Sequence, residues 1–257
     1  MQHLLQDMVV ANLFAFLLVF MRLGMAMMVM PGIGDSFVNM QTRLMFALAM
    51  SFVLTPFMAM FLPTMPGTGI GLAFLLMSEA FIGLFIGTSM RILLTALDMA
   101  GAIVSIQAGF SNAMIFNPVL ATPGTITGGL YSLLGVTLLF VTDLDHNMLA
   151  SVVESYKTFP ADGRMPDMGS FSAAIAKVVT MTFRIGIQMS APFLVVGTLI
   201  QLGFGLLGRL MPQLQVFFLA MPLQIFLSLI ILAMTLSVCM LYWLDAFQGL
   251  LSQSLIH

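Results

Sequence analysis

The chain consists of long apolar stretches separated by short breaks that are rich in proline and glycine. A helix needs about 20 apolar residues to cross the hydrocarbon core of a bilayer, and most of these stretches approach or exceed that length. The pattern predicts helices over residues 8–30, 44–62, 70–97 with a continuation to 109, 126–142, 171–210 and 216–251.

The last two apolar tracts are too long for simple membrane spans. Each has about 35–40 residues, which gives roughly 50–60 Å of helix at about 1.5 Å per residue, whereas the hydrocarbon core is about 30 Å thick. Each tract must therefore bend, form a hairpin, or stand partly outside the membrane in contact with protein. Pro192 and Pro222 are the positions where kinks are predicted.

Residues 148–159 follow a different pattern. Their apolar side chains recur at the spacing of one helix face, and Glu154 and Lys157 lie off that stripe. The segment is therefore predicted to be an amphipathic helix at a membrane interface rather than a span. The hydrophilic stretch 160–170 that follows is predicted to be a loop. The apolar stripe comprises Met148, Leu149, Val152, Val153 and Tyr156.

Composition places the chain among membrane-associated, all-α proteins. Hydrophobic residues make up 60% and charged residues 7%, with a mean hydropathy of +1.10, whereas soluble domains carry about 25% charged residues.

A net charge of −2 without a basic cluster argues against a nucleic-acid partner. The single Cys239 excludes an intramolecular disulfide and a multi-cysteine metal site. Residues 1–10 contain no Lys or Arg, so we expect the first helix to be retained rather than cleaved.

Four of the charged residues inside apolar tracts stand out, because a charge there costs about 2.5–3.5 kcal/mol on insertion scales. One hypothesis is a proton or ion route. The other is structural, with an arginine that pairs with a glutamate or caps carbonyl groups at a subunit interface. We favour the structural hypothesis because one carboxylate among scattered arginines makes no chain of titratable groups. The four residues are Arg22, Glu79, Arg91 and Arg184. The basic residues favour no set of loops, so they predict no topology.

Three further motifs have structural explanations. Residues 203–208 match G-x-G-x-x-G but lie inside an apolar tract without the strand and the acidic residue that a dinucleotide site needs. We expect a close helix-packing surface there, and another at Gly83 and Gly87, which form G-x-x-x-G. His146 follows Asp143 and Asp145 in a turn, which could suggest a metal site, but we expect a solvated loop at a helix end instead. No serine, cysteine or histidine arrangement indicates nucleophilic catalysis, so we expect no enzyme activity, metal or cofactor.

Residues 104–124 combine apolar and backbone-breaking residues. A long apolar helix runs here into a stretch of Gly, Ser, Asn and Pro that still contains Phe110, Met114, Ile115 and Phe116. Irregular backbone at membrane depth is tolerated only where it is buried in protein or lines a cavity. The segment is therefore either a loop that plugs or lines a conduit or an ordinary connector packed against the protein. The 26 methionines favour adaptable, gap-filling surfaces.

Residues 205–225 (GLLGRLMPQLQVFFLAMPLQI) carry the most specific resemblance to a known family. They are similar to a signature that combines a Gly-rich helix end with Arg209, Pro212, Gln213, Phe217 and Pro222. Residues 101–118 (GAIVSIQAGFSNAMIFNP) and 140–160 add support in the same order. The chain as a whole resembles the FliR/SctT family of type III secretion export-gate subunits.

The resemblance implies a single domain over residues 1–257, with a FliP-like part to about 170 and a FliQ-like helical hairpin from about 171. It implies a non-enzymatic core subunit that assembles with several copies of FliP and FliQ, alongside FlhA and FlhB. Unfolded flagellar proteins would pass through the assembly. The expected location is the bacterial inner membrane at the flagellar basal body, in contact with lipid and with part of the chain on the periplasmic side.

The resemblance also implies a plug loop that closes the pore. By position, its residues are Ile106, Gln107, Phe110, Met114, Ile115, Phe116, Asn117 and Pro118. Three alternatives stay open. The chain could be an injectisome subunit of the SctT type, a scaffold that never lines the conduit, or a small-solute secondary transporter, which also uses intramembrane charges and proline-broken helices.

Overall fold

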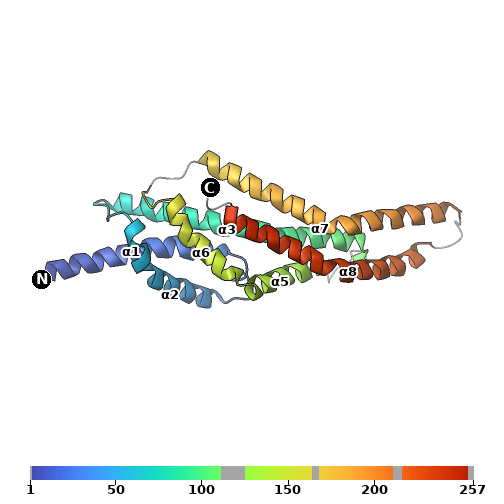
Figure 1. The fold of residues 1–257 in the computed structure, drawn as a ribbon, viewed down its shortest axis with the longest axis horizontal. Coiled ribbons are helices and arrows are strands. Elements are labelled where there is room, and N and C mark those ends of the chain that lie inside the picture. Colours follow the sequence, from blue (N-terminus) through green and yellow to red (C-terminus); the bar gives the residue numbers. More distant parts are fainter. Residues whose placement is uncertain (1, 111–124, 164–167, 211–215, 254–257) are drawn as a thin grey trace. The chain divides into compact units, whose positions relative to one another are not determined.

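The computed structural model describes residues 2–110, 125–163, 168–210 and 216–253. Within these ranges the regular structure is helical and contains no strand, which confirms the all-α prediction. The helices are α1 (Gln2–Val29), α2 (Met40–Met58), the short 3-10 helix η1 (Ala59–Phe61), α3 (Gly69–Gln107), α5 (Ile126–Val141), α6 (Leu144–Thr158), α7 (Met168–Leu210) and α8 (Val216–Gln253) (Figure 1).

Five of these helices are long and apolar enough to cross a membrane: α1, α2, α3, α7 and α8. The pair α5 and α6 would add a sixth crossing if it acts as one broken span, because the two helices meet at a bend of 76°. The residue at the bend, Asp143, has a left-handed backbone with a φ of 55°. These lengths confirm a membrane protein with apolar helices.

The two long C-terminal tracts are each one uninterrupted helix. Helix α7 has 43 residues with Pro192 inside it, and α8 has 38 residues with Pro222 inside it. At about 1.5 Å per residue these helices are roughly 65 and 57 Å long. Neither tract forms a hairpin by itself. The two helices instead run antiparallel to each other as the arms of one α7–α8 hairpin (Figure 1). Hydrogen bonds from Cys239 Sγ to Met189 O at 3.6 Å and from Tyr242 Oη to Gln188 Oε1 join them.

The helices pack into two compact units. Unit 1 comprises residues 1–92, 139–178 and 247–257, and unit 2 comprises residues 93–138 and 179–246. Helices α3, α5, α7 and α8 each contribute to both units. The division at about residue 170 stays a prediction.

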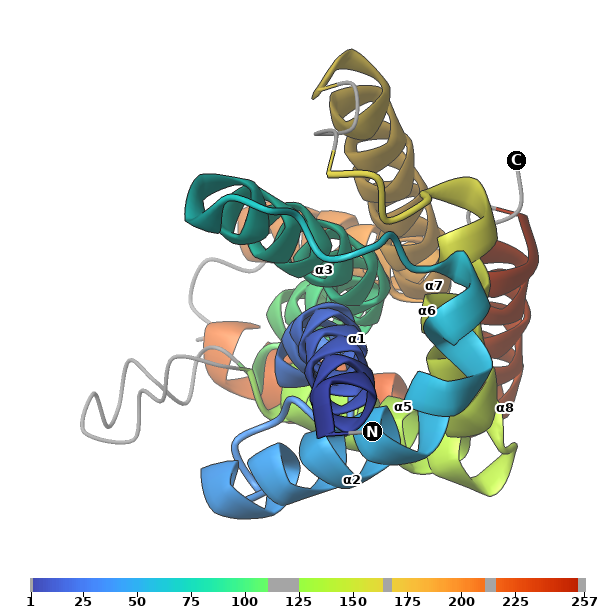
Figure 2. The same ribbon diagram turned by 90° about the vertical axis from the view of Figure 1, so that its left-hand side faces the viewer.

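Unit 1 is organised around α1, which lies among α2, α3 and α6 (Figure 2). One core cluster contains Val19, Met58, Tyr156 and Ala161, and another contains Phe14, Leu18 and Leu75. The same unit contains a group of aromatic rings, in which Phe171 packs against Phe81, Phe85 and Phe159.

The prediction of an amphipathic helix over residues 148–159 is confirmed. Helix α6 is amphipathic as predicted, but Met148, Val152 and Tyr156 of its apolar stripe are buried inside unit 1. Its location at a membrane interface stays a prediction, because the burial of these residues shows what covers part of the helix and not where a bilayer lies. The amphipathic pattern identifies an apolar neighbour without specifying whether that neighbour is lipid or protein.

The G-x-x-x-G pair is a close contact between α3 and α1, as predicted. A Cβ atom on Gly83 would lie 2.1 Å from Arg22 O, and one on Gly87 would lie 2.5 Å from Ala26 O. Within the chain, a Cβ atom on Gly203, Gly205 or Gly208 would meet nothing within 4 Å. The G-x-G-x-x-G face is therefore open in the chain, and its packing against another molecule stays a prediction.

We expect Gly83→Ala to lower the free energy of unfolding in detergent by about 1–3 kcal/mol. The new methyl group would meet the backbone of α1, which cannot move aside as the end of a flexible side chain can. Gly203→Ala is the control. It removes a helix-interior glycine without a clash and should raise stability by up to about 1 kcal/mol. Thermal unfolding of the two purified variants measures the difference, and equal midpoints would contradict the close contact.

Candidate functional site

The first candidate site is a buried ion pair in unit 1. Arg22 of α1 holds Glu79 of α3 with two hydrogen bonds, from Nε to Oε2 at 2.7 Å and from Nη2 to Oε1 at 2.9 Å. Both side chains are 0% exposed. Two parallel bonds between a planar guanidinium and a carboxylate are the strongest form of such a pair.

Three groups from α6 and the residue that follows it complete the surroundings of Arg22. Its Nη1 donates to Ser155 Oγ at 3.1 Å, and its Nη2 donates to Phe159 O at 2.9 Å. The guanidinium carbon lies 3.8 Å from the centre of the Tyr156 ring, within the range of cation–π attraction. One arginine thus joins α1, α3 and α6.

This arrangement suits a structural clasp. A buried pair is stable only when further hydrogen bonds satisfy the remaining donors, and Arg22 has them. The sequence suggested a subunit interface for Arg22 and Glu79, whereas in this chain their partners belong to the chain's own core. A role at an interface stays a prediction for Arg91 and Arg184.

A second charged cluster holds the loop between α1 and α2. The Asp35 carboxylate accepts a hydrogen bond from Gly32 N at 2.8 Å and pairs with Arg91 of α3. Arg43 Nη2 donates to Asp35 O at 2.8 Å and to Val38 O at 3.3 Å. Sequence reasoning selected Arg91 and missed Asp35, although an acidic residue beside Gly32 and Gly34 in a short break was an available signal. Arg184 lies on an exposed position of α7.

The described part of the predicted plug segment lies at the end of α3. Ile106 is exposed, Gln107 is the last residue of the helix, and Phe110 is half-buried. Gly109 ends the helix with a φ of 79°, a conformation that glycine adopts without strain. Residues 114–118 of the predicted plug lie outside the described residues.

Gln107 contacts two helices in unit 2. The Gln224 side chain of α8 donates from Nε2 to Gln107 O at 2.7 Å. Gln201 of α7 lies farther away, with 3.5 Å between its Nε2 and Gln107 Oε1. Sequence reasoning missed Gln224, although an amide side chain inside the apolar tract 216–251 was an available signal.

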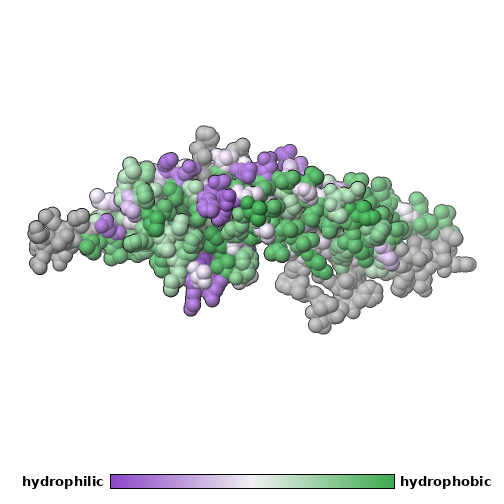
Figure 3. All heavy atoms as spheres, turned by 60° about the horizontal axis from the view of Figure 1, so that its bottom comes forward, coloured by the Kyte–Doolittle hydropathy of each residue, from purple (hydrophilic) through white to green (hydrophobic). Residues whose placement is uncertain are grey.

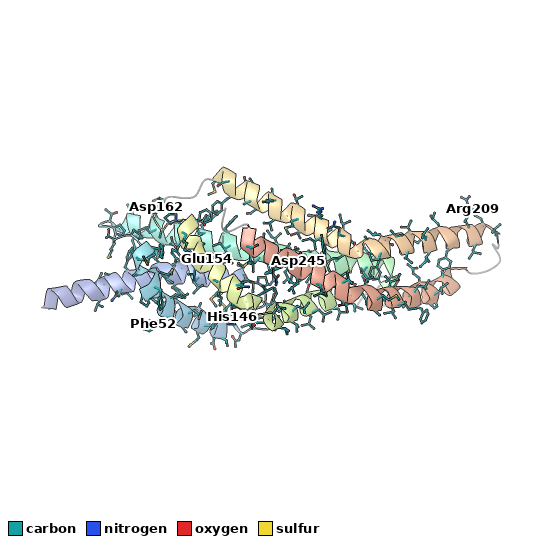
Figure 4. The ribbon with its side chains drawn as sticks, viewed as in Figure 1. Phe52, His146, Glu154, Asp162, Arg209 and Asp245 are labelled. Carbon is teal, nitrogen blue, oxygen red and sulfur yellow. The ribbon has the colours of Figure 1, made fainter. Side chains whose placement is uncertain are left out.

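The described residues of the signature belong to the end of α7 and to α8. Arg209 is exposed at the end of α7 (Figure 4), and Pro222 is exposed inside α8. Pro212 and Gln213 lie outside the described residues, as does the side chain of Phe217.

The turn before α6 brings Asp143, Asp145 and His146 together. Their ligand atoms lie within 4.8 Å of one another, and His146 Nδ1 is 3.2 Å from Asp145 Oδ1. His146 lies on the surface at the start of α6 (Figure 4). Exposed acidic groups often gather in this way without an ion, so we assign no metal here.

Most of the helix surface is apolar and uncovered. Only 11% of the most apolar window of α7 is buried, compared with 17% in α8 and 22% in α2. The face shown in Figure 3 is predominantly hydrophobic, and Phe52 projects outward from α2 in Figure 4. An apolar surface this extensive indicates burial against lipid or other protein chains.

Residues 13–250 match the family described as "Bacterial export proteins, family 1". The chain is 38% identical to the flagellar biosynthetic protein FliR of Caulobacter vibrioides, over 91% of this chain and 93% of that protein. It is 29% identical to FliR of Bacillus subtilis, over 87% and 86% of the two chains. It is also 30% identical to the Yop proteins translocation protein T of Yersinia pestis, over 60% and 59%.

Proposed function

Because this chain belongs to the bacterial export proteins, family 1, and is therefore a component of an export apparatus, we propose that it is a core subunit of the flagellar type III export gate. In this role it assembles with FliP and FliQ in the bacterial inner membrane and works with FlhA and FlhB. Unfolded flagellar proteins cross the membrane through the channel of that assembly. The protein carries out no chemical reaction in this role.

The open surface of α7 supports this proposal most directly. The helix is roughly 65 Å long, about twice the thickness of a hydrocarbon core, and little of it is buried in the chain. Lipid covers at most about 30 Å of a helix perpendicular to the bilayer, so the remaining apolar surface needs protein neighbours. An assembly of several helical subunits supplies them.

Residues 106–118 are the part of the chain that we assign to closure of the channel. Their root lies at the end of the 39-residue helix α3, because Ile106 and Gln107 are its last two residues and Phe110 follows shortly after them. Apolar side chains such as Ile106 and Phe110 exclude ions because an unpaired charge is costly in apolar surroundings. They also separate without breaking strong bonds, which suits the passage of an unfolded chain.

Co-purification tests the proposed assembly. When the tagged chain is expressed with FliP and FliQ, we expect all three to elute as one complex from size exclusion in detergent. The chain expressed alone should be recovered in lower yield, because its apolar helices lack their neighbours. A stable monomer or small homo-oligomer that ignores FliP and FliQ would support a secondary transporter instead.

Two observations distinguish the proposed function from a scaffold that never lines the channel and from an injectisome subunit. A scaffold that never lines the channel would give no crosslink from position 106 or 110 to a stalled export substrate. The flagellar assignment rests on the FliR match, which covers 91% of the chain, compared with 60% for the Yersinia translocation protein. Loss of motility on deletion, restored by the intact gene, is the expected phenotype of the flagellar subunit.

A further inference from the structure

One exposed face of the α7–α8 hairpin carries a polar stripe, defined as Arg184, Gln188, Tyr242 and Asp245. All four side chains are exposed, and all belong to unit 2. Arg184 and Gln188 are four positions apart on α7, and Tyr242 and Asp245 are three positions apart on α8, so each pair shares a helix face. The hydrogen bond that Tyr242 Oη donates to Gln188 Oε1 joins the two faces into one surface.

The stripe contains two opposite charges at the same level of the hairpin. Because α7 and α8 run antiparallel and Gln188 contacts Tyr242, one turn back along α7 brings Arg184 to the level of the residues that follow Tyr242. Asp245 lies there, on α8 (Figure 4). Within the described residues, neither Arg184 nor Asp245 forms an ion pair. Both charges are therefore available to groups outside the chain.

Large apolar side chains surround these charges on the same surface. Phe183 and Ile187 are 55% and 49% exposed on α7, and Val238 and Leu241 are 68% and 60% exposed on α8. Lipid suits these side chains but disfavours the charges, whereas water suits the charges but disfavours a contiguous apolar patch. A protein surface that combines apolar and charged groups satisfies both.

A hollow of about 250 Å³ lies in the groove beside the stripe. It is lined by Gln188, Met189, Val238, Cys239 and Tyr242. Met189 and Cys239 are buried, so they line its inner side. The volume is several times the roughly 30 Å³ that one water occupies in the liquid, so a side chain from outside fits. Protein interfaces concentrate their binding energy where such an anchor fills a pocket.

We propose that the polar stripe and the hollow together bind one helix of a neighbouring subunit of the export gate. The charges define that helix, which carries an acidic side chain opposite Arg184 and a basic side chain opposite Asp245. An apolar side chain about one helical turn farther along enters the hollow. This inference rests on the proposed function, because it takes the partner helix from the same assembly.

Charge reversal tests the contact. In the chain co-expressed with FliP and FliQ, we expect Arg184→Glu and Asp245→Lys each to lower the yield of assembled complex at least about 10-fold, because like charges then face each other. Glu154→Lys is the matched control. Glu154 is exposed on the polar side of the amphipathic helix α6 (Figure 4), and its reversal should change the yield by less than about 2-fold.

The double variant Arg184→Glu with Asp245→Lys distinguishes a partner helix from an ion pair within the chain. If the two residues paired with each other in the assembly, exchanging the charges would restore the yield and overturn the proposal. A partner helix predicts that the double variant assembles no better than either single variant. A photo-crosslinking residue at position 238, beside the hollow, should link the unaltered chain to FliP or FliQ, and a link to neither would overturn the proposal.

The same experiment separates this contact from the proposed function. If all the variants assemble as well as the unaltered chain, the polar stripe is a solvated surface, and the proposed function stands without it. If the unaltered chain itself does not co-purify with FliP and FliQ, the proposed function is wrong and the contact is wrong with it.

Discussion

Replacing Arg22 by methionine is expected to destabilise the protein by about 3–5 kcal/mol, because Glu79 would stay buried as an unpaired charge. The same change leaves Ser155 Oγ and Phe159 O without their donor. For a chain of this size the loss corresponds to a fall in Tm of roughly 6–20 °C. Thermal unfolding of the purified complex, followed by size exclusion, provides the measurement.

The double variant Arg22→Met with Glu79→Met distinguishes the cost of an unpaired charge from the cost of altered packing. Replacing a whole buried pair by apolar residues of similar volume is often neutral or stabilising, so the second substitution should recover most of the loss. Arg91→Met is the matched control, since Arg91 is 38% exposed and pairs with Asp35 at the edge of a loop. It should cost less than about 1 kcal/mol. Equal losses for Arg22→Met and Arg91→Met would contradict the clasp.

Replacement of residues 110–116 by glycine and alanine should raise the ion conductance of the assembled gate by roughly tenfold or more, which corresponds to a loss of about 1.4 kcal/mol or more from the closed state. Large apolar side chains are removed from the proposed constriction, while the helix that precedes them, which ends at Gln107, stays intact. Conductance is measured as dye or ion flux in cells that express the complex without substrate.

The control for this replacement is a conservative exchange. Phe110→Leu keeps an apolar side chain of comparable bulk and should leak far less than the Gly and Ala variant, since apolar exchanges of similar volume are tolerated best. Unchanged conductance after replacement of the whole segment would remove residues 110–116 from the closed pore. The chain could still be an export-gate subunit in that case, because the family match covers residues 13–250.

The sequence predicted the helices well because apolar runs are local signals. The proline and glycine break at residues 63–67 places the end of one helix and the start of the next to within a few residues. The interpretation of Gly83 and Gly87 as a contact face was also confirmed, since small residues four positions apart lie on one helix face.

Pairings between distant elements were not predictable from the sequence. Arg22 and Glu79 both stood out as charges in apolar tracts, but their pairing depends on how α1 and α3 rotate as they pack. Asp35 escaped notice because its pairing with Arg91 spans 56 residues. The neighbours of α6 were not predictable for a related reason. An apolar stripe shows that a helix has an apolar neighbour, while the neighbour's identity depends on the tertiary fold.

Synthesis order separates the two partners of the Arg22–Glu79 pair in time. The two residues are 57 positions apart, so at about 5–20 residues per second the ribosome makes Glu79 roughly 3–11 s after Arg22. During that interval α1 carries an unneutralised charge that disfavours transfer into lipid by about 2.5–3.5 kcal/mol. The pairing with Glu79 removes that cost only after the third helix has been made, so the first helix is held in lipid less firmly before that point.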